Sequence, residues 1–368
     1  MAPRENRSIA LLPRPIVIRM NRHVSDGYTT VSGSDWPFPP RPRIPTRSGT
    51  DALRACLRSA SLAESTILLP AFICRGAFSR CFEAFDIDPV FVDVDPNTMQ
   101  IDPARAENHL DSVDAILLNH AFGRPFAVDR WHRLAGNHDT ILIEDCARAL
   151  GAEGGHGPVG STGQYAIYSF AKVSPLSRGG ALVLHDIPPP LPTPSSLSPT
   201  VLAHTVSDLL PTRFRPFLAR LDALRPSLGQ TEPQDTADTH ALGLEFLTSL
   251  RFERHLRTQF KDSLSRHRHY ADRLEAILER EGIRVQEKPR GSVDHVLQTV
   301  VPGRRDRLLE QLRAHDYPVH AVWTDPWGPA TGSYPIAEYL ADHVLTFRLR
   351  EWSDDRIDRL ALDLPHLG

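Results

Sequence analysis

The chain has 368 residues, 42 lysines and arginines, 45 aspartates and glutamates, and a formal net charge of -3. This length allows one large domain and a smaller one, and the near-neutral charge gives no general attraction to nucleic acid or anionic membranes. The four cysteines show neither CxxC spacing nor a secreted disulfide pattern. The apolar run near the start contains prolines and arginines, which disfavours a signal peptide or a spanning helix. We therefore expect a soluble, cytoplasmic protein with neither a nucleic-acid nor a membrane partner.

Apolar strand-like runs alternate with helical patterns between residues 48 and 186. This alternation is typical of an α/β domain built on a mostly parallel sheet. The pattern predicts strands over residues 67–69, 90–94, 115–119, 141–144, 165–170 and 181–184. It predicts helices or capped turns over residues 51–62, 75–86, 102–112 and 129–139.

The rest of the chain divides by composition. Residues 1–40 are proline-rich and form an N-terminal extension, and the large α/β domain is predicted over residues 41–246. Within it, residues 187–200 are rich in proline and serine and form a linker or a surface loop. A small C-terminal α+β domain is predicted over residues 247–368. It begins with a long charged helix and continues as strand, helix, strand and helix over 293–302, 304–315, 317–323 and 353–364.

Two motifs, a GxGxxG stretch and a HxH pair, are weak indications of a binding site. Gly155, Gly157 and Gly160 satisfy GxGxxG, but the motif contains Pro158 and lies between strand-like stretches, so a hairpin or loop is favoured over a dinucleotide site. His267 and His269 form a HxH pair, but residues two apart on a helix face different ways. No cluster of acidic residues or cysteines accompanies them, so no metal site is predicted.

A lysine stands out in the stretch YSFAKVSPLSRGGALVLHD. The chain has only three lysines, Lys172, Lys261 and Lys288, and Lys172 follows an apolar strand where arginine would supply the same charge. Arginine stays protonated, whereas a buried lysine can lose its proton and act as a nucleophile. This contrast indicates an amine with a chemical role.

Two other positions complete a possible cofactor site. Asp145 follows a buried strand, where open α/β sheets bind ligands, although it could simply cap the next turn. Ser48, Gly49 and Thr50 begin a predicted helix, where backbone amides favour a phosphate or serve an ordinary N-cap. Together with Lys172, these residues match the requirements of pyridoxal 5'-phosphate: a lysine for the Schiff base, a carboxylate for the ring nitrogen and a phosphate site.

The residues resemble a known family at this point. The segments SGTDAL, LLPAFICRGAF, VFVDVDPNTMQIDP, LLNHAFGRP, LIEDCARALGA, VGSTGQYAIYSF and AKVSPLSRGGALV follow in the order found in the DegT/DnrJ/EryC1/StrS aminotransferases. The resemblance covers about residues 47–186 and is looser beyond them. It implies a fold type I, pyridoxal phosphate-dependent transferase with a mostly parallel central sheet in a large domain and a smaller C-terminal α+β domain.

The resemblance also implies residue roles. Lys172 is similar to the Schiff-base lysine, followed at the family's distance by a Gly-Gly pair, and Asp145 is similar to the partner of the ring nitrogen. Gly49, Thr50 and Ser169 correspond to phosphate ligands. Phe72 or Cys74 corresponds to the side chain against the cofactor ring, although core packing is an equal alternative for the phenylalanine. Arg148 stands where the family usually has glutamine, and could bind the ring oxygen or a substrate anion.

Two departures concern the cofactor's phosphate. The spacing between Ser169 and Lys172 is shorter than in many members. No asparagine follows Asn137, so the family's phosphate contact from a partner-subunit asparagine is missing or replaced.

The implied function is an aminotransferase that works as a homodimer with shared active sites. It would move an amino group from an amino acid, by family habit glutamate, to a keto-sugar or another biosynthetic keto-intermediate. The alternatives are a dehydratase-like relative, in which histidine replaces the lysine, and a cofactor-binding or regulatory protein without turnover. A nicotinamide oxidoreductase that uses the glycine-rich stretch is a third alternative.

Overall fold

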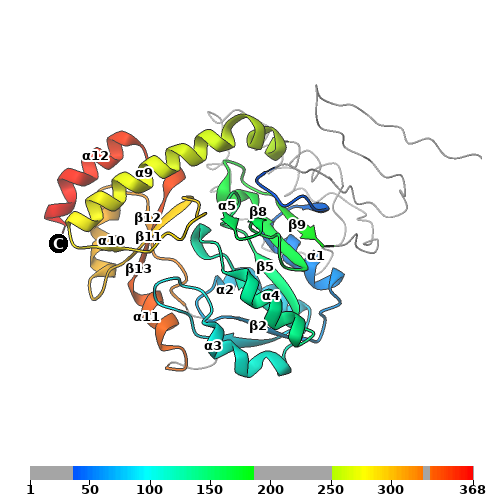
Figure 1. Cartoon of the computed structure of the whole chain (residues 1–368). Helices are drawn as coiled ribbons and strands as arrows, with labels where there is room; N and C mark the ends of the chain where they lie inside the picture. Colours follow the sequence, from blue (N-terminus) through cyan, green and yellow to red (C-terminus); the bar gives the residue numbers. More distant parts are fainter. Residues whose placement is uncertain (1–35, 186–250, 326–331, 368) are drawn as a thin grey trace, which may run out of the picture.

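The computed structural model describes residues 36–185, 251–325 and 332–367 (Figure 1). Residues 1–35, the Pro/Ser-rich stretch 187–200 and the rest of the segment up to residue 250 lie outside the described residues, so the predictions made for them remain predictions. Among the described residues, no helix combines the length and apolarity needed to cross a membrane.

A seven-stranded sheet forms the first and larger part of the fold. Its order is β1-β9-β8-β5-β4-β2-β3, and β9 runs antiparallel to both of its neighbours, whereas the other pairings are parallel. The sequence prediction of a mostly parallel sheet is therefore confirmed. The strands are β1 Arg43–Thr46, β2 Thr66–Pro70, β3 Asp88–Val92, β4 Ala115–Asn119, β5 Ile141–Asp145, β8 Tyr165–Ser169 and β9 Gly180–Leu184.

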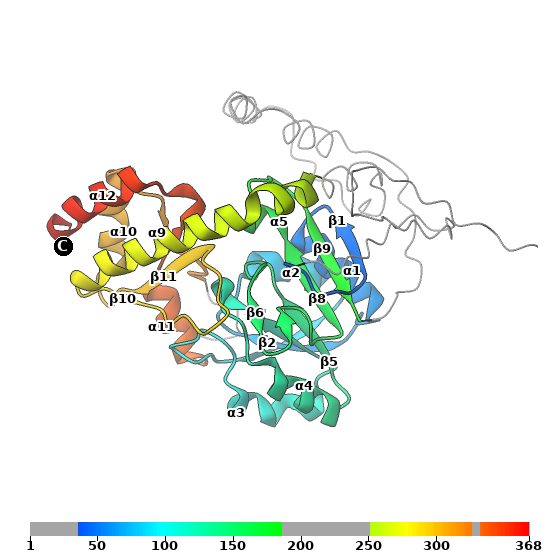
Figure 2. The ribbon, with the colours of Figure 1, turned by 45° about the horizontal axis from the view of Figure 1, so that its top comes forward.

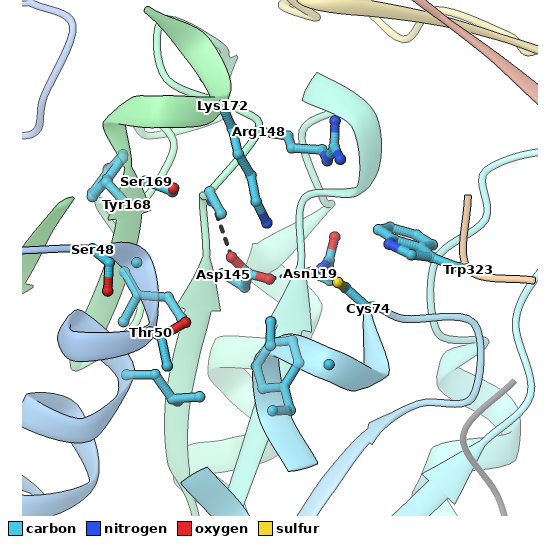
Figure 3. Close-up of a pocket in the computed structure, with 17 residues that line it drawn as sticks. Ser48, Thr50, Cys74, Asn119, Asp145, Arg148, Tyr168, Ser169, Lys172 and Trp323 are labelled. Atoms are coloured by element: carbon cyan, nitrogen blue, oxygen red, sulfur yellow. Dashed lines mark hydrogen bonds between the residues drawn. The ribbon is translucent and has the colours of Figure 1, made fainter. Parts of the chain in front are cut away.

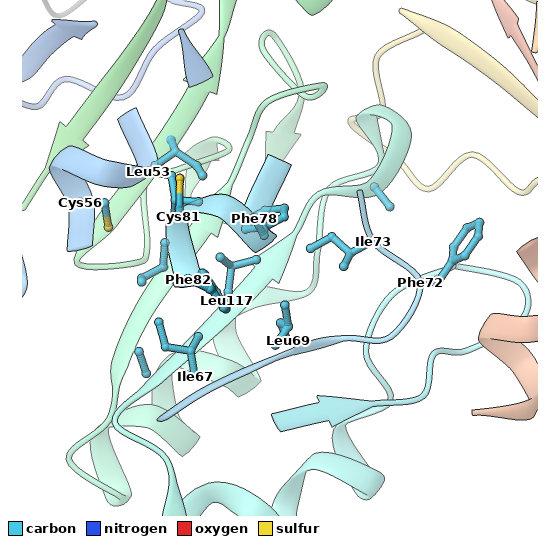
Figure 4. Packing of buried hydrophobic residues seen from close by; sticks show 14 of the residues in the cluster. Leu53, Cys56, Ile67, Leu69, Phe72, Ile73, Phe78, Cys81, Phe82 and Leu117 are labelled. Atoms are coloured by element: carbon cyan, nitrogen blue, oxygen red, sulfur yellow. The ribbon is translucent and has the colours of Figure 1, made fainter. Parts of the chain in front are cut away.

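Helices cover both faces of this sheet, as the apolar character of its central strands requires. The helices are α1 Gly49–Ser59, α2 Arg75–Ala84, α3 Pro103–Ala106, α4 Val128–Asn137 and the short α5 Phe170–Val173. Alternate residues of β2 and β4 point to opposite faces. Ile67, Leu69 and Leu117 pack against α1 and α2 (Figure 4), whereas Leu68 and Ile116 belong to the separate cluster that includes residues of α4.

Two predicted stretches differ from a continuous helix or strand. The range 102–112 becomes α3 followed by a 3₁₀ helix, Glu107–Ser112. The side chain of Asp102 caps α3 by accepting a 3.0 Å bond from the amide of Ala104, while Ser112 Oγ donates to the carbonyl of His109. The glycine-rich stretch forms the hairpin of β6 Glu153–Gly154 and β7 Gly157–Pro158, so the prediction of a hairpin rather than a dinucleotide loop is confirmed.

A four-stranded antiparallel sheet forms the C-terminal part, with the order β10-β11-β13-β12. Residues 251–255 are helical and lead through a π-helical turn, Leu256–Phe260, into α9 Lys261–Arg280. The remaining elements are β10 Arg284–Val285, β11 Val296–Val300, α10 Arg305–Ala314, β12 Val319–His320, α11 Pro335–His343, β13 Val344–Arg348, the 3₁₀ helix Leu349–Glu351, α12 Asp354–Asp363 and the 3₁₀ helix Leu364–His366. The sequence analysis predicted neither α11 nor β13.

The two sheets are joined by direct contacts. The helical stretch 251–280, which includes α9, runs from α5 of the large part across to the small sheet (Figure 2). The amide of Val293 donates to the carbonyl of Gly123 at 3.0 Å, and the amide of Glu153 donates to that of Gly291 at 2.9 Å. These contacts bring the start of β11 beside the carboxyl ends of the parallel strands, so residues of both parts can line one site.

Candidate active site

A cavity of about 310 Å³ lies at the carboxyl ends of the parallel strands (Figure 3). Asn119 ends β4, Asp145 ends β5 and Ser169 ends β8, and all three line the cavity together with the N-terminus of α1. This is the edge at which open α/β sheets bind ligands. The sheet topology therefore brings together residues that are far apart in the sequence.

Asp145 is buried and held from two sides. Its Oδ2 accepts a 2.8 Å hydrogen bond from Nδ2 of Asn119, and its Oδ1 accepts a 3.0 Å bond from the amide of Ala147. Burial raises the pKa of Asp145, and the charge on Lys172 and the amide of Ala147 act in the opposite direction. A cation beside this carboxylate would therefore stabilise its charged form, which burial disfavours.

Lys172 lies on α5 and extends into the same cavity toward Asp145 (Figure 3). Burial, followed by the charge on Arg148, lowers the pKa of Lys172, while the charges on Asp145 and Cys74 raise it. No hydrogen bond joins its amine to another residue within the described ranges. A desolvated amine of this kind is more easily deprotonated and can act as a nucleophile.

The N-terminus of α1 forms the opposite wall. Ser48 is the N-cap, and its Oγ accepts a 3.1 Å bond from the amide of Asp51 and donates to Asp51 Oδ2 at 2.8 Å. Gly49 and Thr50 supply the next amides, which an α-helix leaves without an intrahelical acceptor. A Cβ on Gly49 would lie 2.9 Å from Cβ of Ser169, so only glycine allows this close approach. Of the two alternatives from the sequence, the structure shows the N-cap, and the amides of Gly49 and Thr50 leave the phosphate site as a prediction.

Arg148 lines the cavity beside Lys172 (Figure 3). Its Nε is buried and has no hydrogen-bond partner within the described part of the chain. Burial, followed by the charge on Arg348, lowers the pKa of Arg148 to about 10, so the side chain remains a cation at neutral pH. An anionic or carbonyl oxygen is the group that would satisfy it.

Phe72 is the one predicted site residue that does not line the cavity. Its ring is buried in the core (Figure 4). It packs edge-on against Trp323, with a centroid distance of 5.0 Å. Of the two side chains expected against the cofactor ring, the structure places Cys74 in the lining and leaves Phe72 behind it. The segment between β2 and α2 is not a regular strand, so the spacing of two residues does not place both side chains on the same side.

The sequence analysis missed Asn119 and Trp323. Asn119 could have been found by the rule that singled out Asp145, because it also ends a buried strand. Trp323 comes from the C-terminal part, where it stacks on Phe122 at 4.4 Å, and both residues have positive φ values of 53° and 58°. No local signal marks Trp323.

A buried group of His120, Glu144 and Cys146 has metal-ligand atoms close together. Nε2 of His120 lies 2.8 Å from Glu144, whose carboxylate also accepts backbone amides, including that of Thr162 at 2.9 Å. The Nδ1 of His120 accepts a 2.9 Å bond from the amide of Phe126. The ring nitrogens of His120 and the carboxylate of Glu144 are already satisfied, and their bonds hold the loops before α4 and before β8.

The cavity fits pyridoxal 5'-phosphate in three respects. The close approach of Gly49 to Ser169 leaves helix-end amides for a phosphate, the buried carboxylate of Asp145 suits a protonated ring nitrogen, and the amine of Lys172 is in reach of the same space. The orphaned Nε of Arg148 offers a further donor for a ring oxygen or a substrate anion.

Comparison with known proteins places a family match over the large sheet. The model of the DegT/DnrJ/EryC1/StrS aminotransferase family matches residues 42–187, which confirms the family resemblance for that segment. The chain is 32% identical over 147 residues to an L-glutamine:2-deoxy-scyllo-inosose aminotransferase of Streptomyces paromomycinus, covering 39% of this chain and 34% of the relative. It is 31% identical over 147 residues to a pleiotropic regulatory protein of Geobacillus stearothermophilus, covering 38% of each. The chain thus spans little more than a third of the length of these relatives.

Solved structures extend the likeness to the whole fold. The PLP form of Spr1654 from Streptococcus pneumoniae, a proposed sugar aminotransferase, superimposes with a TM-score of 0.66 at 17% identity. The superposition covers 89% of this chain and 86% of that one. The fold is therefore that of the fold type I pyridoxal phosphate-dependent transferases, as the sequence analysis predicted.

Proposed function

We propose that this protein is a pyridoxal phosphate-dependent aminotransferase that transfers an amino group to a keto-sugar or a similar hydroxylated ketone. The observation that carries the proposal is the placement of Lys172 and Asp145 in one cavity with the N-terminus of α1. The family match over residues 42–187 and the inosose aminotransferase relative support it.

The residues of the cavity would hold the cofactor in a defined way. Gly49, Thr50 and Ser169 would bind its phosphate, and Asp145 would pair with the ring nitrogen while Asn119 holds the carboxylate in place. Cys74 and Trp323 lie where they could border the ring. Bound pyridoxal phosphate would supply an electron-accepting ring that stabilises negative charge on a substrate carbon.

Lys172 would carry the proton transfers. Its Nζ would hold the cofactor at the aldehyde carbon, and as an unprotonated amine it would take a proton from the substrate carbon as general base and return one as general acid. The lowered pKa of this amine favours its unprotonated form, which a general base must have. Arg148 would bind an anionic group of the cofactor or donor, through a nitrogen that is unsatisfied within the described residues.

The proposal extends to the donor and the assembly. We take glutamate as the amino donor and a homodimer as the working form, as expected from the family. Glutamine is the alternative donor, because the inosose relative is named for it.

Two other outcomes remain in competition. A dehydratase-like reaction is disfavoured because Lys172 is present where that branch has histidine. A cofactor-binding protein without turnover is favoured by one observation, the relative named as a pleiotropic regulatory protein. The intact pair of Lys172 and Asp145 favours turnover instead.

The test is the visible absorbance of the purified chain with added pyridoxal phosphate, before and after glutamate or glutamine, beside Lys172→Ala and the exposed control Lys261→Ala. The aminotransferase proposal predicts a band of lysine-bound cofactor in the wild type and the control, its absence in Lys172→Ala, and bleaching by the donor. A band that neither donor bleaches would favour the binding protein, and the absence of any band would refute cofactor binding itself.

A further inference from the structure

A second cavity of about 340 Å³ shares Lys172 with the first. Its other walls come from the loop after α5, the π-helical turn with α9, the start of β11 and the segment after β13. We call it the histidine pocket, after His255, His267 and His295, which all line it. The family match ends at residue 187, so these three side chains lie outside the matched segment.

The histidines carry nitrogen atoms that no described residue satisfies. Nε2 of His295 lies 2.9 Å from the carbonyl oxygen of Leu150, which can only accept, so this nitrogen carries the proton and Nδ1 presents a lone pair. His295 is 3% exposed, and its Nδ1 has no partner among the described residues. Nε2 of His255, which is 8% exposed, and Nδ1 of His267 are also buried nitrogens without a hydrogen-bond partner among the described residues.

These imidazoles are held neutral. Burial is the first cause in each case, and it lowers the pKa of His267 to about 3 and that of His295 to about 4, while the pKa of His255 is lowered as well. The charges on Arg148 and Arg350 act on His295 in the same direction. A neutral imidazole with one nitrogen protonated offers a hydrogen-bond acceptor, and a buried acceptor without a donor is costly.

The remaining lining is aromatic, polar and basic. The rings of Tyr270 and Trp352 border the pocket, and Nε1 of Trp352 is a buried donor that no described residue satisfies. Arg350 is already used, because its Nη1 donates to the carbonyl of Ala171 at 2.7 Å and lies 3.4 Å from that of Ser174. Arg266 is exposed at the rim and donates to Ser263 Oγ. No carboxylate occurs among the described lining residues.

The backbone of the pocket is also unusual. The π-helical turn Leu256–Phe260 interrupts the helix directly after His255 and carries Gln259 into the lining. Short π-helical turns within α-helices are frequent at functional sites. This local geometry is independent of the unsatisfied nitrogens and points to the same place.

We propose that the histidine pocket binds the hydroxyl groups of the amino acceptor, an uncharged polyhydroxylated ring, with the imidazoles of His255, His267 and His295 as hydrogen-bond acceptors. Hydroxyl groups donate to lone pairs and accept from the Trp352 N–H, and the aromatic rings cover the C–H faces of such a ring. Because Lys172 lines both cavities, a ketone carbon of this ring would lie beside the reactive amine. This inference rests on the proposed function for the reaction, but the binding it predicts does not require turnover.

The experiment measures binding of myo-inositol, an uncharged cyclic polyol without a ketone, by NMR titration of the full chain with and without pyridoxal phosphate. We expect saturable binding to the wild type and dissociation constants that rise about three- to tenfold in His295→Phe and in His267→Phe. His267→Phe keeps the bond between His295 and Leu150, so weaker binding in this variant cannot come from the loss of that bond. The matched control is His269→Phe, two residues along α9, where the imidazole lies 3.1 Å from Asp354; it should bind as the wild type does.

Two results would overturn the inference. One is the absence of saturable myo-inositol binding, or binding that both pocket variants leave unchanged. The other is inorganic phosphate that binds in a histidine-dependent way and displaces the polyol, since the pocket would then be an anion site. The visible cofactor band, recorded on the same samples, separates the two hypotheses: its absence refutes the proposed function, whereas a normal band with no polyol binding refutes this inference alone.

Discussion

The side-chain amide of Asn119 donates a 2.8 Å hydrogen bond to Asp145, its register partner on the neighbouring parallel strand. In Asn119→Leu, one oxygen of a buried carboxylate loses its donor, which costs about 1–3 kcal/mol in the free energy of unfolding. The pKa of Asp145, already raised by burial, would rise further and weaken binding of a protonated ring nitrogen. Urea denaturation and titration with pyridoxal phosphate measure both effects. Asn137→Leu, on the exposed end of α4, should leave cofactor affinity unchanged, and equal affinity in Asn119→Leu would contradict the role of this bond.

Gly49→Ala tests the phosphate site. Its Cβ would lie 2.9 Å from Ser169 Cβ, so α1 and β8 must separate at a cost of about 1–3 kcal/mol, and the helix-end amides would move. We expect weaker binding of pyridoxal phosphate and of inorganic phosphate as its competitor, both followed by absorbance. Gly136→Ala is the control, because it has no atom within 4 Å of its Cβ and should stabilise α4 by roughly 1 kcal/mol. Undiminished affinity in Gly49→Ala would place the phosphate elsewhere.

Arg148→Met tests the electrostatic link to Lys172. The charge on Arg148 lowers the pKa of Lys172, so its removal should raise that pKa, since protonation of the amine then meets less repulsion. The rate at which the visible cofactor band forms depends on the unprotonated amine, so its midpoint should move to higher pH. Arg133→Met, exposed on α4, controls for a general change in charge. A midpoint that stays in place or moves to lower pH would show that the two side chains are not coupled.

Phe72 and Trp323 should respond differently to truncation. Phe72→Leu removes core packing and should cost about 1 kcal/mol in the free energy of unfolding, without a change in the cofactor spectrum. Trp323→Leu alters the wall of the cavity and should change the position or the circular dichroism of the visible band. The reverse pattern would return the ring contact to Phe72.

His295 should make the protein less stable in acid. Its folded pKa of about 4 lies below the ordinary value of 6.5, so the unfolded chain binds a proton between these values that the folded chain does not. The contribution of His295 is therefore present above about pH 6.5 and lost as the pH falls toward 4, by at most about 1.4 kcal/mol per pH unit. His295→Gln, whose amide can still donate to Leu150, should show a flatter decline of Tm with falling pH. His132→Gln, exposed on α4, should decline as the wild type does, and so should His295→Gln if burial does not depress this pKa.

Local patterns were sufficient for most of the large sheet and for part of the site. Strands such as 115–119 were recognisable because a parallel strand covered on both faces is a continuous apolar run. The edge strand Arg43–Thr46 contains a proline and only four residues, so it carries no such run and was missed. Asp145 and Lys172 were found because each follows a recognisable strand. Asn119 meets the same criterion, but its contact with Asp145 depends on strand order, which the sequence does not state.

The sequence by itself determined the alternation of strands and helices, and it predicted a role for Lys172 and for the N-terminus of α1, because each depends on neighbours within a few residues. Tertiary structure alone decided that Trp323 reaches the first cavity and that His255, His267 and His295 meet in the second. The sequence predicted that His267 and His269 face different ways, and the structure places His267 in the pocket and His269 against Asp354. The physical reason is that these contacts arise where α9 and the small sheet pack against the large one, and such packing follows from the burial of whole surfaces rather than from any local spacing.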